Sequence, residues 1–222
     1  MAASVPETWC PPERRVISPR FTEALRVAAE IHAGQRRKGD GPPYVAHVMA
    51  VTAVAFEYGA TEDEAIAALL HDAIEDAPRA LGADGVRSVI RDRFGEAVLH
   101  TVEGCTDADS FPKPPWRARK ESYIAHLAEA DASTLLVSAS DKLHNVRTII
   151  RDFRQLGDLI WIRFSPAAGM PGTVGYYRGL VTAFRARVSI GTPAFGRLVD
   201  ELDAEVAILE TLTGQPGRWP MD

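Results

Sequence analysis

Apolar residues recur every three or four positions along most of the chain, which is the spacing of one face of an α-helix. No stretch alternates apolar and polar residues over four clean repeats with turn residues on both sides, so a β-sheet is not expected. The pattern predicts an all-α, single-domain helical bundle. Helices are expected at residues 18–35, 44–58, 61–77, 84–94, 95–105, from the loop 111–116 to about 128, 133–156, 174–189 and 193–213.

Capping and breaking residues mark some of these boundaries. Thr61 and Glu64 form a capping-box pattern, in which both side chains satisfy free amides at the start of a helix. The helix that they open is expected to run to residue 77, where Pro78 ends it. Residues 165–175 are rich in glycine and proline and are expected to form a loop.

Composition and charge narrow the class of protein. The 222 residues are 46% hydrophobic and 25% charged, as in ordinary soluble proteins, and no apolar run is long enough to span a bilayer. The start of the chain lacks the apolar core of a signal peptide, so a cytoplasmic location is expected. Two cysteines, Cys10 and Cys105, argue against a disulfide framework or a cysteine-rich zinc site. The formal net charge of −5 argues against nucleic-acid binding, whereas a small anionic substrate needs only a local basic patch.

The densest group of chemically active side chains is the sequence His-Asp-Ala-Ile-Glu-Asp at 71–76. If the helix continues through it, His71 lies over Glu75 and Asp72 lies over Asp76, because positions four apart share a face. Neighbouring carboxylates repel one another unless a cation or a proton lies among them. A solvated acidic helix end is the simpler alternative. The two leucines that precede the group favour a half-buried setting instead.

Two further polar residues stand out from apolar surroundings. His47 follows two prolines and a tyrosine at the start of an apolar helix, so it projects from a first helical turn. Asp141 lies mid-helix between leucines, and a buried aspartate needs a cationic partner or a metal. We expect the next residue, Lys142, to point elsewhere on the helix, which favours the metal. His100 and His126 lie on apolar helix faces and are expected to be ordinary core residues.

These residues together resemble a known family. His47, His71-Asp72 and Asp141 reproduce in order the H…HD…D pattern of HD-superfamily phosphohydrolases, in which the four side chains bind a divalent metal. The surrounding motifs resemble those of the hydrolase domain of RelA/SpoT homologues. They are His32-x-x-Gln35-x-Arg37-Lys38, Pro43-Tyr44-x-x-His47, LLHDxxED at 69–76, Phe94-Gly95, Cys105-Thr106-Asp107 and Asp141-Lys142-Leu143-His144-Asn145-x-Arg147. Together they span about residues 21–150, and no region resembles a synthetase domain, so the chain is most similar to the small, hydrolase-only alarmone hydrolases.

The resemblance implies an HD-fold helical bundle and a role for each matching residue. The implied metal ligands, usually of manganese, are His47, His71, Asp72 and Asp141. Glu75 and Asp76 are implied to serve the water that attacks the 3′-diphosphate of the substrate. The residues implied to bind substrate are Arg37 and Lys38 for the base, Asn145 for the ribose, and Lys113 and Tyr176 for phosphate or sugar.

The function implied is that of a metal-dependent pyrophosphohydrolase, which converts ppGpp or pppGpp to GDP or GTP and pyrophosphate. Two alternatives remain open: an HD phosphohydrolase of another nucleotide, for example an NADPH 2′-phosphatase, and a non-catalytic nucleotide-sensing HD module. The sequence GMPGTVGYY lacks the arginine that relatives commonly carry shortly before the tyrosine equivalent to Tyr176, which bears on recognition of the 5′ phosphates. No nucleic-acid or membrane partner is expected, and the sequence leaves the oligomeric state open.

The expected organisation has three parts. Residues 1–20 form an N-terminal extension, residues 21–189 form the HD-type hydrolase domain, and residues 190–222 form a C-terminal helix and tail that pack on the same domain.

Overall fold

The computed structural model describes residues 17–39, 41–109 and 112–219. Across these ranges the chain is helical, and its single β-type pairing is an isolated bridge between Arg36 and Pro43. The prediction of an all-α fold is confirmed. The elements in chain order are α1 (Pro19–Ile31), α2 (Val45–Glu57), α3 (Glu62–Leu70), α4 (Gly82–Phe94), α5 (Glu96–Cys105), α6 (Trp116–Leu127), α7 (Ala132–Leu156), η3 (Gly157–Arg163), α8 (Gly169–Ala186), η4 (Val188–Ile190) and α9 (Pro193–Thr213).

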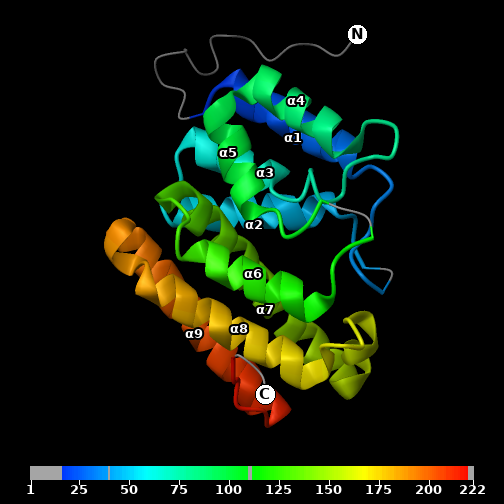
Figure 1. The fold of residues 1–222 in the computed structure, drawn as a ribbon, viewed down its shortest axis with the longest axis vertical. Helices are drawn as coiled ribbons and strands as arrows, with labels where there is room; N and C mark the ends of the chain where they lie inside the picture. Colours follow the sequence, from blue (N-terminus) through cyan, green and yellow to red (C-terminus); the bar gives the residue numbers. More distant parts are fainter. Residues whose placement is uncertain (1–16, 40, 110–111, 220–222) are drawn as a thin grey trace.

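Two clusters of buried side chains form the core, and α7 contributes to both. Helices α1 to α5 surround the first cluster, and α6, α8, α9 and η3 surround the second. The long helix α7 gives Val137 to the first cluster and residues such as Leu143 and Val146 to the second. Figure 1 shows the same arrangement, with α1, α4 and α5 at one end of the molecule, α8 and α9 at the other, and α2, α6 and α7 between them. The middle of the molecule is therefore where residues from both halves can meet.

Helix α3 begins as predicted and ends earlier than predicted. The capping box is present, since the Glu64 amide donates to the Thr61 hydroxyl (3.3 Å) and the Thr61 amide donates to the Glu64 carboxylate (2.7 Å). The helix ends at Leu70, and residues 71–76 form a series of turns, so the expectation of a helix to residue 77 is wrong. The His71 ring provides a physical reason. Its Nδ1 bonds the carbonyl oxygen of Ala68 at 2.9 Å, which a continuing helix would give to the amide of residue 72.

The expected loop at 165–175 is also only partly correct, because α8 begins at Gly169. The amides of Ala168 and Gly169 donate to the carbonyl of Ser165, at 2.9 and 3.1 Å, and this turn leads into the helix. Pro171 lies in the first turn, where an amide has no partner within the helix and its absence costs little. Composition alone suggested a loop because glycine and proline are tolerated at a helix start as well as outside helices.

Helix α1 is shorter than expected and ends at Ile31, so residues 32–39 and 41–44 form a loop before α2. At the other end of the chain, α9 packs against both α7 and α8. None of the described helices combines the length and the apolar character needed to cross a membrane.

Candidate metal and catalytic centre

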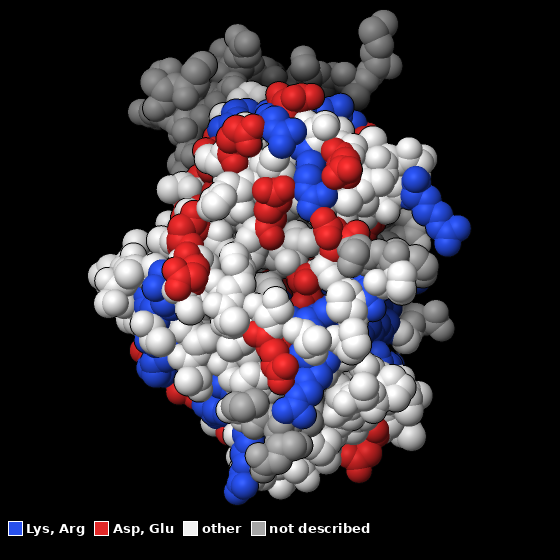
Figure 2. All heavy atoms as spheres, in the orientation of Figure 1, with Lys and Arg blue, Asp and Glu red and all other residues white. Residues whose placement is uncertain are grey.

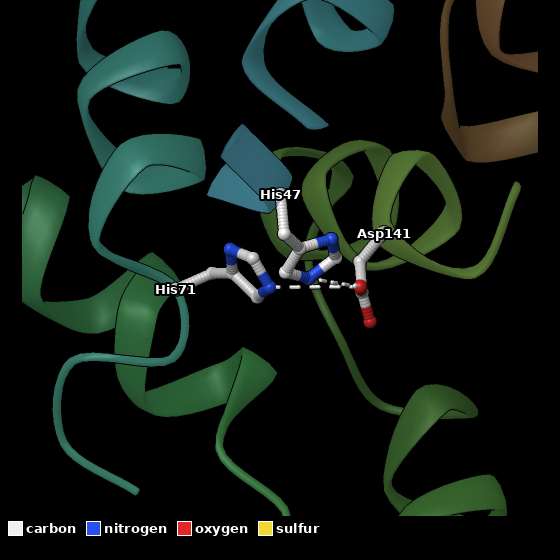
Figure 3. Close-up of side chains that lie close together, drawn as sticks. All are labelled: His47, His71 and Asp141. Carbon is white, nitrogen blue, oxygen red and sulfur yellow. Dashed lines mark ion pairs between the residues drawn. The ribbon is translucent and has the colours of Figure 1, made fainter. Parts of the chain in front are cut away.

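Three elements that are distant in sequence bring His47, His71 and Asp141 together (Figure 3). His47 lies in the first turn of α2, His71 follows the last residue of α3, and Asp141 lies in the middle of α7. All three are buried, with 2%, 2% and 5% of their surface exposed. Asp141 Oδ1 lies 3.2 Å from His47 Nε2 and 3.6 Å from His71 Nε2. The expected convergence of these side chains is thus visible in the fold.

Asp72 adds a second carboxylate to this group. Its Oδ2 lies 3.0 Å from His71 Nε2 and 3.5 Å from His47 Nε2. Both Nε2 atoms are buried, and neither has a hydrogen-bond partner of acceptable geometry among the described residues. Two buried nitrogens and two carboxylate oxygens therefore face the same small volume.

This donor set fits a divalent cation. Donor atoms bound to one ion at about 2.1 Å lie about 3.0 to 3.4 Å apart in octahedral or tetrahedral geometry. The four nitrogen-to-oxygen distances here run from 3.0 to 3.6 Å. An ion would also satisfy the two unpaired nitrogens, which are costly to bury otherwise. The described residues that could hold a metal are accordingly His47, His71 and Asp141, with Asp72 facing both imidazoles.

Electrostatics favour a positive charge at the same point. Burial on its own lowers the pKa of His71, but the Asp72 and Asp141 carboxylates outweigh it and hold that pKa well above its usual value. Burial acts to raise the pKa of Asp141, and Lys142 together with the histidines holds it well below its usual value instead. The site therefore keeps its carboxylates ionised and attracts a cation.

Partners outside the group fix the orientation of both imidazoles. The His71 Nδ1 bond to the Ala68 carbonyl requires a proton on Nδ1, so the neutral imidazole has its lone pair on Nε2, where a bound cation would replace the second proton. His47 Nδ1 lies 2.8 Å from His144 Nδ1. Burial, and the charges of His47 and Arg37, lower the pKa of His144 to about 4, so neutral His144 can accept this bond. In the neutral form of His47 that could bind a metal, Nε2 then carries the lone pair on the side of the carboxylates.

The carboxylates are held by residues of other segments and of α7 itself. The Tyr44 hydroxyl donates to Asp72 Oδ2 at 2.6 Å. Lys142 Nζ lies 2.6 Å from Asp141 Oδ2, so the expectation that Lys142 points elsewhere is wrong. A lysine side chain is long enough to turn back along the helix, and the buried carboxylate is its nearest compensating charge. Asn145, one turn further along α7, donates its amide to Asp141 Oδ1.

Glu75 and Asp76 lie on the turn that follows Asp72, and both are partly buried. Glu75 Oε1 forms an ion pair with Lys113 Nζ at 2.6 Å. Asp76 Oδ2 accepts a hydrogen bond from the side-chain amide of Gln35 at 2.7 Å. The two carboxylates thus have different partners and come from a segment other than the one that carries Asp141.

The residues expected to bind substrate are spread around the group. Arg37 donates to the side-chain oxygen of Asn145 at 2.7 Å, and its guanidinium lies 5.7 Å from the centre of the Tyr44 ring. Lys38 Nζ lies 5.5 Å from the centre of the Phe164 ring. Tyr176 is different, because it is 6% exposed and its buried hydroxyl has no hydrogen-bond partner among the described residues.

On the face seen in Figure 2, the basic side chains of the described residues do not form one large patch. Figure 2 shows acidic and basic side chains mixed over the visible face of the molecule. Arg119 and Lys120 both pair with Asp107, and Lys113 pairs with Glu75. Each of these three basic side chains is therefore already paired with a carboxylate, and Lys113 is paired with one on the turn at 71–76.

Sequence reasoning was wrong about two histidines and missed several contacts. His100 and His126 are exposed rather than buried in the core, because they lie on the outer faces of α5 and α6. The roles of Gln35 and His144 as partners of Asp76 and His47 were not predicted. Both residues belong to the family motifs quoted in the sequence analysis. The motifs therefore pointed to them, although the spacing of apolar residues did not.

Several known proteins are similar to this chain in sequence. Guanosine-3′,5′-bis(diphosphate) 3′-pyrophosphohydrolase MESH1 of Danio rerio is 33% identical over 132 residues, which are 58% of this chain and 68% of the relative. A guanosine-3′,5′-bis(diphosphate) 3′-pyrophosphohydrolase of Aquifex aeolicus is 34% identical over 126 residues, and a GTP pyrophosphokinase of Streptomyces coelicolor is 34% identical over 132 residues. These matches cover 57% and 59% of this chain, but only 17% and 15% of the two bacterial proteins.

Solved structures show the same fold. A metazoan orthologue of SpoT, described as hydrolysing ppGpp, superposes with a TM-score of 0.64 at 23% identity, covering 91% of this chain and 98% of that one. The protein lmo0812 of Listeria monocytogenes superposes with a TM-score of 0.58 at 21% identity, covering 72% and 99%. The sequence pattern of the family described as HD domain matches residues 24–170, which is more than half of the 222 residues and includes His47, His71, Asp72 and Asp141. The chain is therefore a member of the HD domain family.

Proposed function

We propose that the chain is a manganese-dependent pyrophosphohydrolase that removes the 3′-diphosphate of guanosine 3′,5′-bis(diphosphate) or its pentaphosphate analogue. The observation that carries the proposal is the approach of two imidazole nitrogens and two carboxylate oxygens to within 3.0 to 3.6 Å, with Glu75 and Asp76 on the adjoining turn. The names of the relatives supply the substrate class. A mixed nitrogen and oxygen donor set suits manganese, although zinc or iron would accept it as well.

His47, His71, Asp72 and Asp141 would hold the metal. The ion supplies positive charge that polarises the phosphoryl group and makes a nearby water easier to deprotonate. Burial of His47, His71 and Asp141 keeps competing water away from three of the four donors. Tyr44 and Lys142, which bond Asp72 and Asp141, keep the two carboxylates turned toward the histidines.

Glu75 and Asp76 would handle the protons of hydrolysis. One carboxylate accepts a proton from the attacking water as the bond from water oxygen to phosphorus forms. The bond between that phosphorus and the 3′-oxygen breaks, and the 3′-oxygen takes up a proton. The products are a nucleoside 5′-diphosphate or 5′-triphosphate with a free 3′-hydroxyl, and pyrophosphate. Lys113, which pairs with Glu75, can exchange this carboxylate for a phosphate oxygen when substrate binds.

Arg37, Lys38 and Asn145 would bind the nucleoside part. The Arg37 guanidinium is already held by Asn145 and lies near the face of Tyr44, so a base that stacks on it loses little conformational freedom. We also propose phosphate or sugar contacts for Lys113 and Tyr176. The Tyr176 hydroxyl has no partner among the described residues, but it is buried, so this contact requires that substrate binding expose it.

We propose residues 21–189 as the hydrolase domain, residues 190–222 as a helix and tail on the same domain, and residues 1–20 as an extension. The packing of α9 on α7 and α8 supports this division. Residues 1–16 lie outside the described part of the chain. A cytoplasmic location is proposed with the substrate, because free nucleotides are the material that such an enzyme would act on.

The test is incubation of purified protein with manganese, magnesium or chelator and a panel of nucleotides, followed by chromatography of the products. Release of pyrophosphate and GDP from guanosine tetraphosphate, only with a divalent metal, is expected. An Asp72→Asn protein prepared in parallel controls for contaminating hydrolases. Turnover of another nucleotide such as NADPH, but not of guanosine tetraphosphate, would replace the proposed substrate. Metal binding without any turnover would favour a nucleotide-sensing module.

A further inference from the structure

His32 and Gln35 form a chain of hydrogen bonds that ends on Asp76. His32 Nδ1 lies 2.6 Å from Gln35 Oε1, and Gln35 Nε2 donates to Asp76 Oδ2 at 2.7 Å. His32 is buried, with 2% of its surface exposed, and Gln35 is half-buried. The first bond links residues three apart, whereas the second crosses 41 positions of sequence to reach the turn after α3.

The chemistry of the three groups allows only one direction for this chain. An ionised carboxylate has no proton to give, so it requires the amide nitrogen of Gln35. The amide oxygen must then face His32, and His32 must carry its proton on Nδ1. His32 Nε2 is buried without a partner among the described residues, which suits the unprotonated nitrogen of this tautomer. The imidazole therefore fixes the amide, and the amide fixes the carboxylate.

The loop that carries these residues is itself closed by backbone hydrogen bonds. The Tyr44 amide donates to the Gln35 carbonyl at 2.9 Å, and the Arg37 amide donates to the Pro42 carbonyl at 3.0 Å. The His32 ring packs on the Tyr44 ring, with centroids 4.9 Å apart. Gln35 and Tyr44 thus lie side by side in the loop, joined by this one backbone hydrogen bond.

The same loop holds both ends of the turn at 72–76. Tyr44 donates to Asp72 Oδ2 at 2.6 Å, and Gln35 donates to Asp76 Oδ2 at 2.7 Å. The turn is closed by a bond from the Asp76 amide to the Asp72 carbonyl at 2.9 Å. Asp76 Oδ1 accepts no bond from the described residues, so that oxygen is left for water or substrate. The two loop residues therefore hold different parts of the site. Tyr44 holds Asp72 of the metal group, and Gln35 holds Asp76 beside it.

We infer that His32 and Gln35 are positioning residues, which hold the Asp76 carboxylate so that its free oxygen faces the reacting phosphate and water. The inference rests on the proposed function, because its main test measures the turnover of guanosine tetraphosphate. Neither residue touches the substrate, and neither belongs to the metal group. Loss of either should therefore reduce turnover without reducing metal content.

Manganese-loaded, full-length variants test the inference. Gln35→Met keeps the bulk of the side chain and removes its donor, and we expect kcat to fall by about 10- to 100-fold with KM and manganese content nearly unchanged. Gln35→Glu places a second carboxylate against Asp76 and should cost at least as much. His32→Leu should lower kcat, whereas His32→Asn, whose amide can donate from near the position of Nδ1, should recover much of it. Tyr44→Phe is the matched control on the same loop, and it should lower manganese affinity instead.

A double-mutant cycle decides whether Gln35 acts through Asp76. Because the amide has no other target in the site, Gln35→Met combined with Asp76→Asn should be no slower than Asp76→Asn alone. Losses that multiply would overturn the inference, and so would a Gln35→Met protein that loses manganese. If wild-type protein hydrolyses no guanosine tetraphosphate, the proposed function fails, and crystal structures of wild type and Gln35→Met decide the inference separately. An Asp76 side chain with the same orientation in both would then count against it.

Discussion

Asp141 shows how one buried residue combines a structural and a functional demand. Its two oxygens face His47 and His71 on one side and Lys142 on the other. The lysine partly compensates the carboxylate, so the helix can form before a metal is present. The other oxygen, Oδ1, is still directed at the histidines. A neutral side chain at this position would lose the charge that pairs with Lys142 or the oxygen that faces the histidines.

At the level of single residues, metal binding and catalysis should separate. Asp141→Ala should remove metal and activity together, because it deletes one of the donor oxygens. Glu75→Ala and Asp76→Ala should keep metal content near normal while activity falls by about 10²- to 10⁴-fold, the usual contribution of a positioned acid or base. Metal analysis and turnover on each variant make the comparison. Full activity in the Glu75 and Asp76 variants would refute the proposed roles even if the metal group is correct.

Lys142 gives a second prediction at this scale. Lys142→Met should lower the free energy of unfolding of the metal-free protein by about 3 to 5 kcal/mol, since it leaves a buried carboxylate without its partner. The loss should be smaller with saturating manganese, because the ion then compensates Asp141. Urea unfolding with and without metal measures both values. Arg91→Met, which removes the exposed pair with Glu96, is the control and should change stability little. An equal loss in both conditions would contradict the compensating role.

The starts and ends of helices decide where the site residues lie. Because α3 ends at Leu70, the imidazole of His71 and the carboxylate of Asp72 leave the chain from a turn and can face the same point. The His71 backbone still has helical angles (φ −58°, ψ −31°), and the bond from its ring to the Ala68 carbonyl directs Nε2 toward Asp72. The element's early end is therefore part of the site.

The capping box of α3 should be measurable on its own. Thr61→Ala should lower the free energy of unfolding by about 1 kcal/mol, because it leaves the Glu64 amide without its acceptor at the helix start. Thr182→Ala, an exposed threonine inside α8, is the matched control. Chemical denaturation of both variants gives the comparison. A loss no larger than that of the control would show that the Glu64 carboxylate caps this end unaided.

Helices α8 and α9 are joined by charged pairs whose strength should depend on pH. Arg178 bonds Asp203 at 2.5 Å and Glu210 at 2.6 Å. These bonds lower the pKa of Glu210, and they lower that of Asp203 against the effect of burial. With folded pKa values below the unfolded ones, the unfolded chain takes up protons first as the pH falls. The stabilisation is therefore complete above about pH 5 and is lost progressively as the pH falls below about 4, through the lowered folded pKa values.

Arg178→Met tests this dependence. The variant should be less stable than wild type by on the order of 1 kcal/mol at pH 7, because the pairs are partly exposed to solvent. The difference should be smaller at pH 3, because most of these carboxylates are then protonated in the unfolded chain, so folding must compete with that proton uptake. Urea unfolding at the two pH values provides the measurement. A difference that stays constant would mean that Arg178 stabilises the helix pair by packing instead.

Much of the fold and part of the site could be predicted from sequence, for reasons that differ from residue to residue. Helices such as α7 and α9 were predicted to within about one residue because a long apolar stripe fixes their type and Thr192 and Asp131 cap them. The turn at 71–76 was not predicted, because a bond from the His71 ring to a backbone carbonyl does not change the spacing of apolar residues along the sequence. The pairing of Gln35 with Asp76 joins residues 41 positions apart, and no local pattern could indicate it.

For the whole molecule, the metal should act as a cross-link. The ion would join α2, the turn after α3, and α7, and so would bind the folded state in preference to the unfolded one. At about 100 times its dissociation constant, a metal adds about 2.7 kcal/mol to the free energy of unfolding. For a chain of this size, that corresponds to about 5 to 11 °C in Tm.

Thermal unfolding with manganese and with chelator measures this shift. Asp141→Asn should unfold at nearly the same temperature in both conditions, since it lacks a donor oxygen. An unchanged wild-type Tm would contradict metal binding at this site.

The division of the core also sets an order of events during protein synthesis. The buried residues of the first cluster lie between Ala24 and Cys105, apart from Val137 on α7. A growing chain can therefore begin to pack this cluster, with His47, His71 and Asp72 already in place, before α7 has been made. At about 5 to 20 residues per second, the ribosome needs about 2 to 7 s more to reach Asp141. During that interval the nascent protein holds an incomplete set of donors, so firm capture of the ion must wait for the helix that also joins the two halves.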